Sequence, residues 1–187
     1  KARAEANRTI KALKPYLQKN IPILGLEPSC LFTFKDEFLS LIDDDVAPVL
    51  AKNAMLLEEF LAGDGSHGFS RLKFQRVPER VAWVHGHCHQ KAFNSMDAVE
   101  QMLQRVPDLT TKMIPSGCCG MAGAFGYQSE TYDASIGMAQ LDLVPALAAV
   151  DHDDWLLADG FSCRHQISDV TGKSPRHVAQ FLARSLQ

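Results

Sequence analysis

The residues best suited to chemistry are two adjacent cysteines in the glycine-rich stretch 115–126. Cys118 and Cys119 stand between Gly117 and Gly120, just after a short apolar segment. Neighbouring side chains in a strand point to opposite faces, and a disulfide between immediate neighbours is strained. A tight turn around a metal-containing group would instead accept both sulfurs from one side. Glycines permit such a turn, because they tolerate positive φ and let backbone N–H groups approach an anion closely.

Short apolar segments at 21–26, 81–84, 110–114 and 155–158 predict the strands that would position these cysteines. Helical patterns separate them, at 2–14, 31–61 (with the best helix formers over 49–61), 93–105 and 130–143. Further helices are expected from Pro145, and from a start at Ser174-Pro175 to Leu186. The alternation predicts an α/β fold with a four-stranded, mainly parallel sheet and helices on both faces.

Every cysteine follows a predicted strand within about five residues; they are Cys30, Cys88, Cys118, Cys119 and Cys163. Open parallel sheets bind ligands at the edge where the strands end, so we expect cysteine loops at that C-terminal edge to gather the thiols in one site. The alternative is that these cysteines only pack a core. Core cysteines belong inside strands and helices, and we expect none of the five there.

Charge limits what can occupy such a site. Two thiolates roughly 4 Å apart repel by about 4 kcal/mol at an effective dielectric of 20, so several thiolates need compensating cations. Zinc takes four ligands, usually from C-x₂₋₄-C pairs, and the sequence has no such pair. Iron–sulfur clusters take thiolates from distant segments, so the spacing favours a multinuclear cluster. A zinc-holding structural or interaction domain and a metal-free thiol redox domain remain alternatives.

Composition narrows the protein class. With 187 residues, 46% of them hydrophobic and 22% charged, the chain is predicted to be one globular domain. A formal charge of −3 argues against a nucleic-acid partner. No signal peptide opens the sequence, and its five cysteines cannot all pair internally, so we expect a cytoplasmic protein. The first residue is Lys1 rather than Met, which suggests a fragment of a longer polypeptide.

Four separated motifs resemble the cysteine-rich CCG domain that occurs in heterodisulfide reductase and in the iron–sulfur subunits of glycolate and lactate oxidases. They look most like the C-terminal part of FAD-linked oxidoreductases of D-2-hydroxy acids, including D-2-hydroxyglutarate-type dehydrogenases. The spacing agrees, with 29 residues between Cys88 and Cys118 and 43 between Cys119 and Cys163. The motifs are Gly-Leu-Glu-Pro-Ser-Cys (25–30), His-Gly-His-Cys-His-Gln-Lys-Ala (85–92), Gly-Cys-Cys-Gly-Met-Ala-Gly-Ala-Phe-Gly-Tyr (117–127) and Gly-Phe-Ser-Cys-Arg-His-Gln-Ile (160–167).

The resemblance implies that residues 1–187 are a single CCG domain from the C-terminal part of a flavin and iron–sulfur oxidoreductase. It implies a [4Fe-4S] cluster, cubane or non-cubane, held by the five cysteines, and FAD in the parent protein but not in this chain. The chain would relay electrons from a flavin domain to a quinone, an electron-transfer protein or a disulfide, without being catalytic alone. A peripheral position at the inner face of the membrane is compatible with this role.

The chain departs from the family pattern at one cysteine. That pattern often ends Cys-x-x-Cys, whereas Gln166 stands three positions after Cys163. The related proteins also commonly carry two cysteine-rich halves, so Cys30 either replaces the missing thiol or belongs to a preceding half. Four other residues are assigned to the cofactor site: Gly117 and Gly120 as close-approach glycines, and His87 and His89 as ligands or as residues that orient their neighbours.

Overall fold

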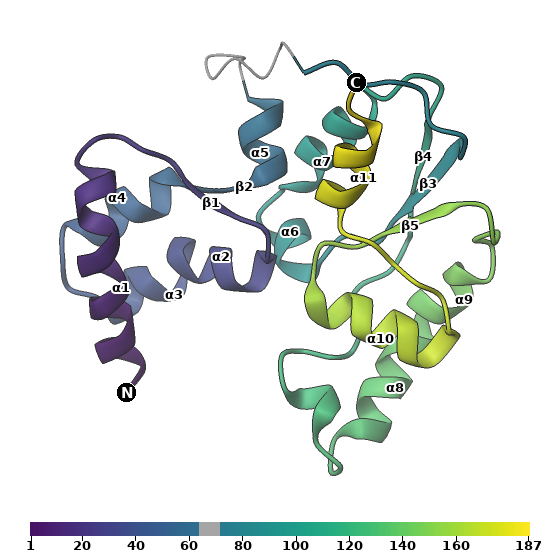
Figure 1. Cartoon of the computed structure of the whole chain (residues 1–187). Helices are drawn as coiled ribbons and strands as arrows, with labels where there is room; N and C mark the ends of the chain where they lie inside the picture. The colour runs from purple at the N-terminus through teal and green to yellow at the C-terminus, as the bar shows by residue number, and fades with distance from the viewer. Residues whose placement is uncertain (64–71) are drawn as a thin grey trace. The chain divides into compact units, whose positions relative to one another are not determined.

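The computed structural model of this protein describes residues 1–63 and 72–187. These residues form two compact units, Lys1–Phe60 and Leu61–Gln187, which are here called unit 1 and unit 2 (Figure 1). The α/β class predicted from the sequence is confirmed, and every strand pairing in the two named sheets is parallel. None of the helices in the described ranges is long and apolar enough to cross a bilayer.

Unit 1 packs helices around two short strands. The strands β1 (Ile23–Gly25) and β2 (Ala54–Leu56) pair in parallel, with Ile23 opposite Ala54 and Gly25 opposite Leu56. Its core includes Ile10, Phe32 and Leu50, all nearly inaccessible to solvent. The helices are α1 (Ala2–Leu17), α2 (Pro28–Lys35), α3 (Glu37–Leu41), α4 (Val46–Asn53) and α5 (Leu57–Ala62), the last of which runs into unit 2.

Two sequence predictions in unit 1 are wrong. The helix expected over 49–61 is interrupted by β2, because residues 54–56 pair with β1 and that tertiary pairing overrides their helical propensity. The sequence also predicts a disturbance of the first helix near Pro15, yet α1 continues through it to Leu17. Here Ala6, Ile10 and Leu17 bury one side of the helix, and this burial outweighs the missing proline N–H.

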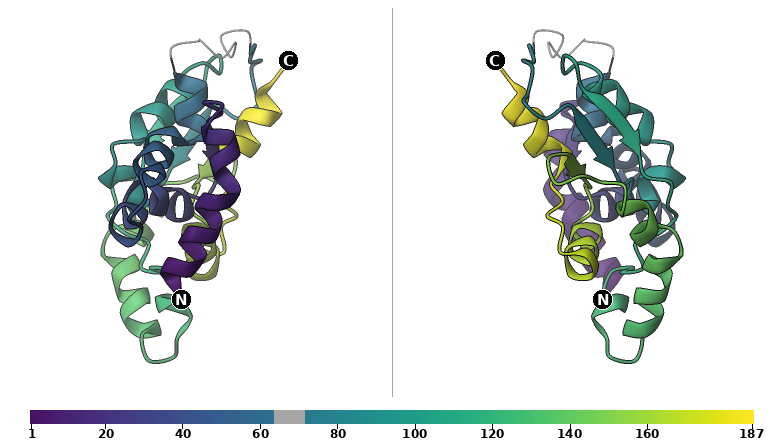
Figure 2. Two further views of the ribbon diagram at one scale, coloured as in Figure 1. Left: turned by 90° about the vertical axis from the view of Figure 1, so that its left-hand side faces the viewer. Right: turned by 90° about the vertical axis from the view of Figure 1, so that its right-hand side faces the viewer.

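Unit 2 contains a three-stranded parallel sheet in the order β4-β3-β5. Its strands are β3 (Val81–Val84), β4 (Thr110–Met113) and β5 (Trp155–Leu157), and β3 and β4 run side by side in Figure 2. The helices are α6 (Cys88–Ala92), α7 (Met96–Leu103), the 3₁₀ turn η2 (Phe125–Tyr127), α8 (Tyr132–Leu141), α9 (Leu143–Leu147), α10 (Phe161–Thr171) and α11 (Val178–Ser185).

Helices cover both faces of this sheet, as the alternation of side chains requires. Ala82 and Val84 of β3, with Leu157 of β5, join a core formed with helices α7 and α11. On the opposite face, Leu156 and Ala158 join a second core formed with α9 and α10. Strands β3 and β5 therefore pack on both sides, which explains their continuous apolar sequences. The edge strand β4 has the sequence Thr-Thr-Lys-Met and stays partly exposed.

The single four-stranded sheet expected from the sequence is wrong. The strand expected over 21–26 pairs with β2 inside unit 1, while the other three expected strands form the sheet of unit 2. A parallel strand needs only one neighbour, and residues 54–56 supply it locally. The chain therefore divides its strands between two sheets, of two and of three strands.

Two helix starts in unit 2 also differ from expectation. The last helix begins at Val178, because Arg176 is held in an extended bridge beside β5, with Arg176 N 2.8 Å from Leu156 O. The helix expected from Pro145 begins two residues earlier, at Leu143, whose side chain is fully buried. In both cases packing against the sheet outweighs the local start signal.

Candidate functional site

Four of the five cysteines follow the strands of unit 2. Cys88 is the first residue of α6 after β3, Cys118 and Cys119 follow β4, and Cys163 lies in the first turn of α10 after β5. Since the three strands are parallel neighbours, the chain leaves all of them at one edge of the sheet. This arrangement brings together residues that are up to 75 positions apart in the sequence.

The four side chains form a continuous row, here called the sulfur row. The thiols of Cys88 and Cys119 both hydrogen-bond to Cys118, and Cys119 also contacts Cys163. Cys88 is exposed, Cys118 is half-buried, and Cys119 and Cys163 are buried, so the row runs from the surface into the unit. These contacts join four of the five cysteines, and a common site for all five stays a prediction.

The pKa values along the row alternate. Hydrogen bonds from Cys119 and Cys88, helped by the backbone N–H of Gly120 at 3.3 Å, lower the pKa of Cys118 to about 2. The bond from Cys119 likewise lowers the pKa of Cys163 well below its usual value. The pKa values of Cys88 and Cys119 rise, chiefly because each shares its proton with the Cys118 thiolate. Lowered and raised pKa values thus alternate along the row, and this pattern limits the charge that four neighbouring sulfurs would otherwise accumulate.

The loop before the double cysteine is fastened from two directions. His85, buried at the end of β3, places Nδ1 2.9 Å from Ser116 Oγ. Lys91 of α6 donates from Nζ to the carbonyl oxygens of Ser116 and of Gly117, the latter at 3.0 Å. Burial lowers the pKa of Lys91, while the cysteines oppose that shift, so this amine lies within the field of the sulfur row.

Two glycines allow close approach at the row. Gly120 has φ +91°, and a Cβ there would lie 2.2 Å from the carbonyl oxygen of Ser135. A Cβ on Gly160 would lie 2.4 Å from the His87 ring and 3.0 Å from Cys163 Sγ. At Gly117, by contrast, a Cβ would have its nearest contact at 4.0 Å, so no crowding there requires glycine. A cofactor-binding role for Gly117 and Gly120 stays a prediction.

His87 has a structural role at the start of α6. Its Nδ1 accepts a hydrogen bond from the backbone N–H of His89 at 3.1 Å, and its own N–H donates to Gln90 Oε1 at 2.9 Å. Together these contacts form a capping box. The ring of His87 stacks on that of His89, and Nδ1 lies 3.8 Å from Cys88 Sγ. Ligand atoms of His87, Cys88 and His89 all lie within 4.8 Å of one another, a spacing that would suit a shared metal ion. Ligation by these residues stays a prediction.

The shape of the sulfur row bears on which metal would fit. In a tetrahedral zinc site, with Zn–S near 2.3 Å, all sulfurs lie about 3.8 Å apart. Among the residues that the structure describes, no three cysteine sulfurs lie within 4.8 Å of one another. The open row of four thiols therefore lacks the compact tetrahedral arrangement of sulfurs that a four-cysteine zinc site needs.

The prediction that all five cysteines lie in loops is wrong. Cys30 lies in α2, Cys88 in α6 and Cys163 in α10, each within the first turn. Helices begin directly after these strands, so the residues at the sheet edge are helix starts rather than long loops. Cys30 is exposed and belongs to unit 1, and its part in a shared site stays a prediction.

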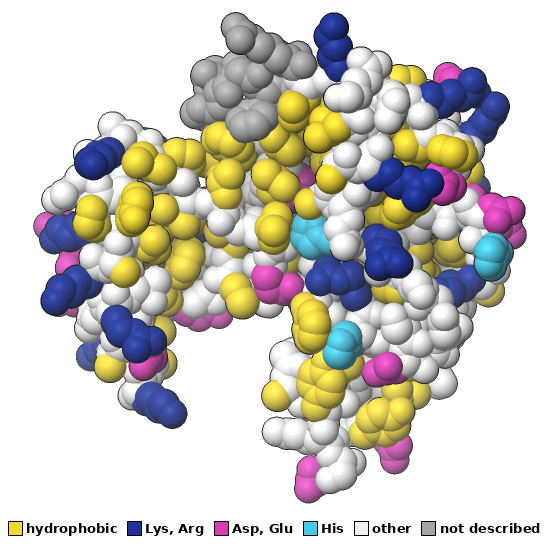
Figure 3. All heavy atoms as spheres, viewed as in Figure 1, with side chains coloured by type: hydrophobic (Ala, Val, Ile, Leu, Met, Phe, Trp, Pro, Cys, Tyr) yellow, Lys and Arg dark blue, Asp and Glu magenta, His cyan; other side chains and the backbone are white. Residues whose placement is uncertain are grey.

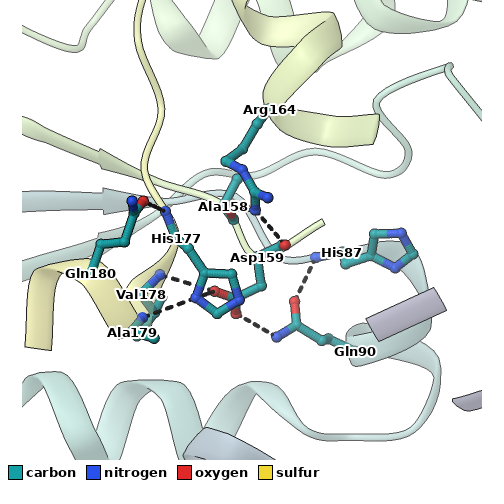
Figure 4. Close-up of polar contacts among 9 residues, drawn as sticks. All are labelled: His87, Gln90, Ala158, Asp159, Arg164, His177, Val178, Ala179 and Gln180. Carbon is teal, nitrogen blue, oxygen red and sulfur yellow. Dashed lines mark hydrogen bonds and ion pairs between the residues drawn. The ribbon is translucent and has the colours of Figure 1, made fainter. Parts of the chain in front are cut away.

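Sequence reasoning missed Asp159 and Gln90. Asp159 is buried directly after β5, and its Oδ2 accepts a hydrogen bond from Gln90 Nε2 at 2.7 Å (Figure 4). A lone acid placed immediately after an apolar strand is the signal that could have identified it. Nearby, Lys, Arg and His side chains gather where α10 begins, on the face seen in Figure 3.

The chain is similar to D-2-hydroxyglutarate dehydrogenases and to one subunit of another dehydrogenase. It is 27% identical to the enzyme of Pantoea ananatis and 26% identical to that of Escherichia coli, in each case over 95% of this chain and 17% of the relative. It is 24% identical to one subunit of the anaerobic glycerol-3-phosphate dehydrogenase of Escherichia coli, over 100% of this chain and 46% of that relative. The chain therefore spans about a sixth of the first two relatives and less than half of the third.

Two further comparisons gave no match. No family model matches the chain, and no solved structure is similar to it.

Proposed function

We propose that this chain is an electron-transfer region of an oxidoreductase and that the sulfur row holds a multinuclear iron–sulfur cluster. The row itself carries the proposal: thiols from the ends of three parallel strands contact one another, and the pKa values of two of them are lowered. Cys88, Cys118, Cys119 and Cys163 would hold the group, with Cys30 as a fifth candidate. Bound there, such a cluster supplies one-electron transfer without proton chemistry.

The comparisons support an oxidoreductase context. The similar proteins are dehydrogenases by name, and one is a subunit of a larger enzyme. With the resemblance of the four motifs, this similarity suggests a parent enzyme in which FAD oxidises a D-2-hydroxy acid or a related substrate. The assignment of residues 1–187 to one CCG domain is part of the same proposal, as are a flavin-domain partner and a quinone, protein or disulfide acceptor.

Chemical analysis of protein purified without oxygen tests the cluster directly. We expect iron and acid-labile sulfide in comparable amounts, with absorbance in the sulfur-to-iron charge-transfer region. Zinc without sulfide would instead support the structural domain. A metal-free chain whose free-thiol count falls by two on oxidation and recovers with dithiothreitol would support the thiol redox domain, in which the contacting pair Cys119 and Cys163 would close a disulfide.

The electron-transfer role is tested in the parent enzyme. Replacing Cys118 or Cys119 by Ser should abolish delivery of electrons to the physiological acceptor while substrate still reduces the flavin. Cys30→Ser tests the fifth candidate: it should leave the iron content unchanged if only the sulfur row binds, and lower it if Cys30 is a ligand. Loss of flavin reduction in the Cys118 variant would contradict this division of roles.

A further inference from the structure

A chain of hydrogen bonds behind the sulfur row connects the starts of two helices through one buried carboxylate. Asp159 Oδ2 accepts from Gln90 Nε2 at 2.7 Å, and Gln90 Oε1 accepts from the backbone N–H of His87 at 2.9 Å. The other oxygen, Asp159 Oδ1, accepts from the backbone N–H of Val178 at 3.0 Å and lies 3.3 Å from His177 Nδ1. Figure 4 shows the carboxylate between the two helix starts.

The backbone of Asp159 connects the same point to α10. Arg164, one residue after Cys163, donates from Nη1 to the carbonyl oxygen of Ala158 at 2.9 Å and to that of Asp159. The side chain of Asp159 thus holds the start of α6, which carries Cys88, while its carbonyl is held by the helix that carries Cys163. Both ends of the sulfur row are therefore connected to position 159, one through the side chain and the other through the backbone.

The order of donors and acceptors in this chain is fixed. The backbone N–H of His87 can only donate, so Gln90 must present its oxygen to His87 and its NH₂ group to Asp159. If the Gln90 amide turned over, its oxygen would face the carboxylate and its NH₂ group would face the His87 N–H. Gln90 is fully buried, so water cannot replace either bond.

We propose that Asp159 is a positioning residue for the sulfur row, acting on Cys88 through Gln90 and the start of α6. This inference rests on the proposed function, because the positions of the four thiols matter only if the sulfur row binds a group. The contacts that carry it are nevertheless independent of any metal. Asp159 would fix the distance between the two ends of the row, and thereby the environment of whatever the row binds.

A swapped pair of side chains tests the connection. Gln90→Glu keeps an acceptor for the His87 N–H but sets a carboxylate against Asp159, so the connection should break. Adding Asp159→Asn should restore the hydrogen bond between positions 90 and 159 with donor and acceptor exchanged. The Asn NH₂ group then donates to the new Glu, and the Asn oxygen accepts from the backbone N–H of Val178. Gln180→Glu is the matched control, because Gln180 Oε1 accepts from His177 N–H in the equivalent capping box of α11.

Hydrogen exchange of the metal-free chain gives a readout that needs no cluster. In Gln90→Glu, backbone amides of α6 should exchange about tenfold faster than in the wild type, and in the double variant they should return to within about threefold. Gln180→Glu should leave them unchanged. A double variant that exchanges as fast as Gln90→Glu, or faster, would overturn the proposal.

The loaded protein gives the second readout. The midpoint potential and the electron paramagnetic resonance signal of the iron–sulfur protein should shift in Gln90→Glu and return in the double variant, which a loss of overall stability would not produce. Unchanged signals in Gln90→Glu would overturn the positioning role. If the wild type contains no iron, the proposed function fails, and the exchange measurements still decide whether Asp159 positions α6.

Discussion

The side-chain amide of Gln166 donates to both oxygens of Ser135, at 3.0 Å to Oγ and 3.3 Å to the carbonyl oxygen. Both residues are buried. The same carbonyl oxygen lies against Gly120, the glycine that follows the double cysteine. At the position where the CCG pattern that this sequence resembles often has a second cysteine, Gln166 therefore connects α10 to α8 next to the cysteine turn.

Removing the hydrogen bonds from Gln166 to Ser135 should destabilise the fold. Gln166→Ala leaves the buried oxygens of Ser135 without this donor, so we expect the free energy of unfolding to fall by about 1–3 kcal/mol. Gln140→Ala, an exposed position on α8, should change it by less than about 0.5 kcal/mol. Chemical denaturation of the three proteins measures both values. Equal stability of Gln166→Ala and the wild type would mean that the bonds to Ser135 contribute nothing net.

A methyl group at Gly160 should disturb the sulfur row directly. Its Cβ would lie 2.4 Å from the His87 ring and 3.0 Å from Cys163 Sγ, so at least one of them must move. We expect Gly160→Ala to lose about 1–3 kcal/mol of stability and to retain less metal.

The matched control for Gly160→Ala is Gly137→Ala. Gly137 lies within α8, and no atom comes within 4 Å of the place where its methyl group would lie. Alanine there should stabilise the helix by up to about 1 kcal/mol. Denaturation curves and the iron content of the two variants show whether Gly160→Ala alone loses stability and metal. If both variants retain equal iron, the contact at Gly160 does not shape the site.

Gly120→Ala should be more damaging than either. The backbone there has φ +91°, which an L side chain rarely adopts, and the Cβ would meet the Ser135 carbonyl at 2.2 Å. Backbone strain and overpacking together should cost roughly 2–5 kcal/mol. Gly117→Ala, three residues earlier with open space around it, is the control. Thermal unfolding that ranks Gly117→Ala as the worse variant would contradict this account.

The sheet of unit 2 and its cysteines could be predicted from the sequence, whereas β2 could not. Strands 81–84 and 155–158 are apolar runs, whereas the weaker strand 110–114 is apolar only at Met113 and Ile114. A cysteine-bearing segment follows each of the three, so the sequence predicts both the strands and their common edge. Residues 54–56 are Ala, Met and Leu, all good helix formers in a helical pattern. Only their pairing with β1 makes them a strand, and that pairing is a long-range contact.

The helix starts at the site could not be predicted from the sequence, for a different reason. Both capping boxes in unit 2 begin with histidine, at His87 and His177, rather than with the serine, threonine or acid that usually signals a start. The helix expected over 93–105 begins only at Met96, and the sequence did not predict the separate short helix α6 that ends at Ala92. Asn94, between the two helices, adopts φ 55°. The two histidine caps therefore stand at positions where sequence rules predict no cap. Asn94, by contrast, is a residue type that tolerates positive φ and could have indicated the break.

The alternation of pKa values along the sulfur row predicts a distinctive pH dependence of thiol reactivity in the metal-free chain. Only the thiolate reacts with iodoacetamide. The pKa of Cys118 is lowered to about 2, so this residue is ionised throughout pH 5–8 and its rate should be nearly independent of pH there. The pKa of Cys88 is raised, so its thiolate fraction and rate should increase about tenfold per pH unit over the same range.

Mass spectrometry of partially alkylated protein separates the two sites, with samples taken before a second cysteine reacts. The control is the chain unfolded in urea, where Cys118 loses its hydrogen-bond donors and its rate should regain the tenfold increase per pH unit of an ordinary thiol. A folded Cys118 with that same steep profile would show that Cys88 and Cys119 do not stabilise its thiolate. The sulfur row would then enter metal binding with four protons to displace rather than about two.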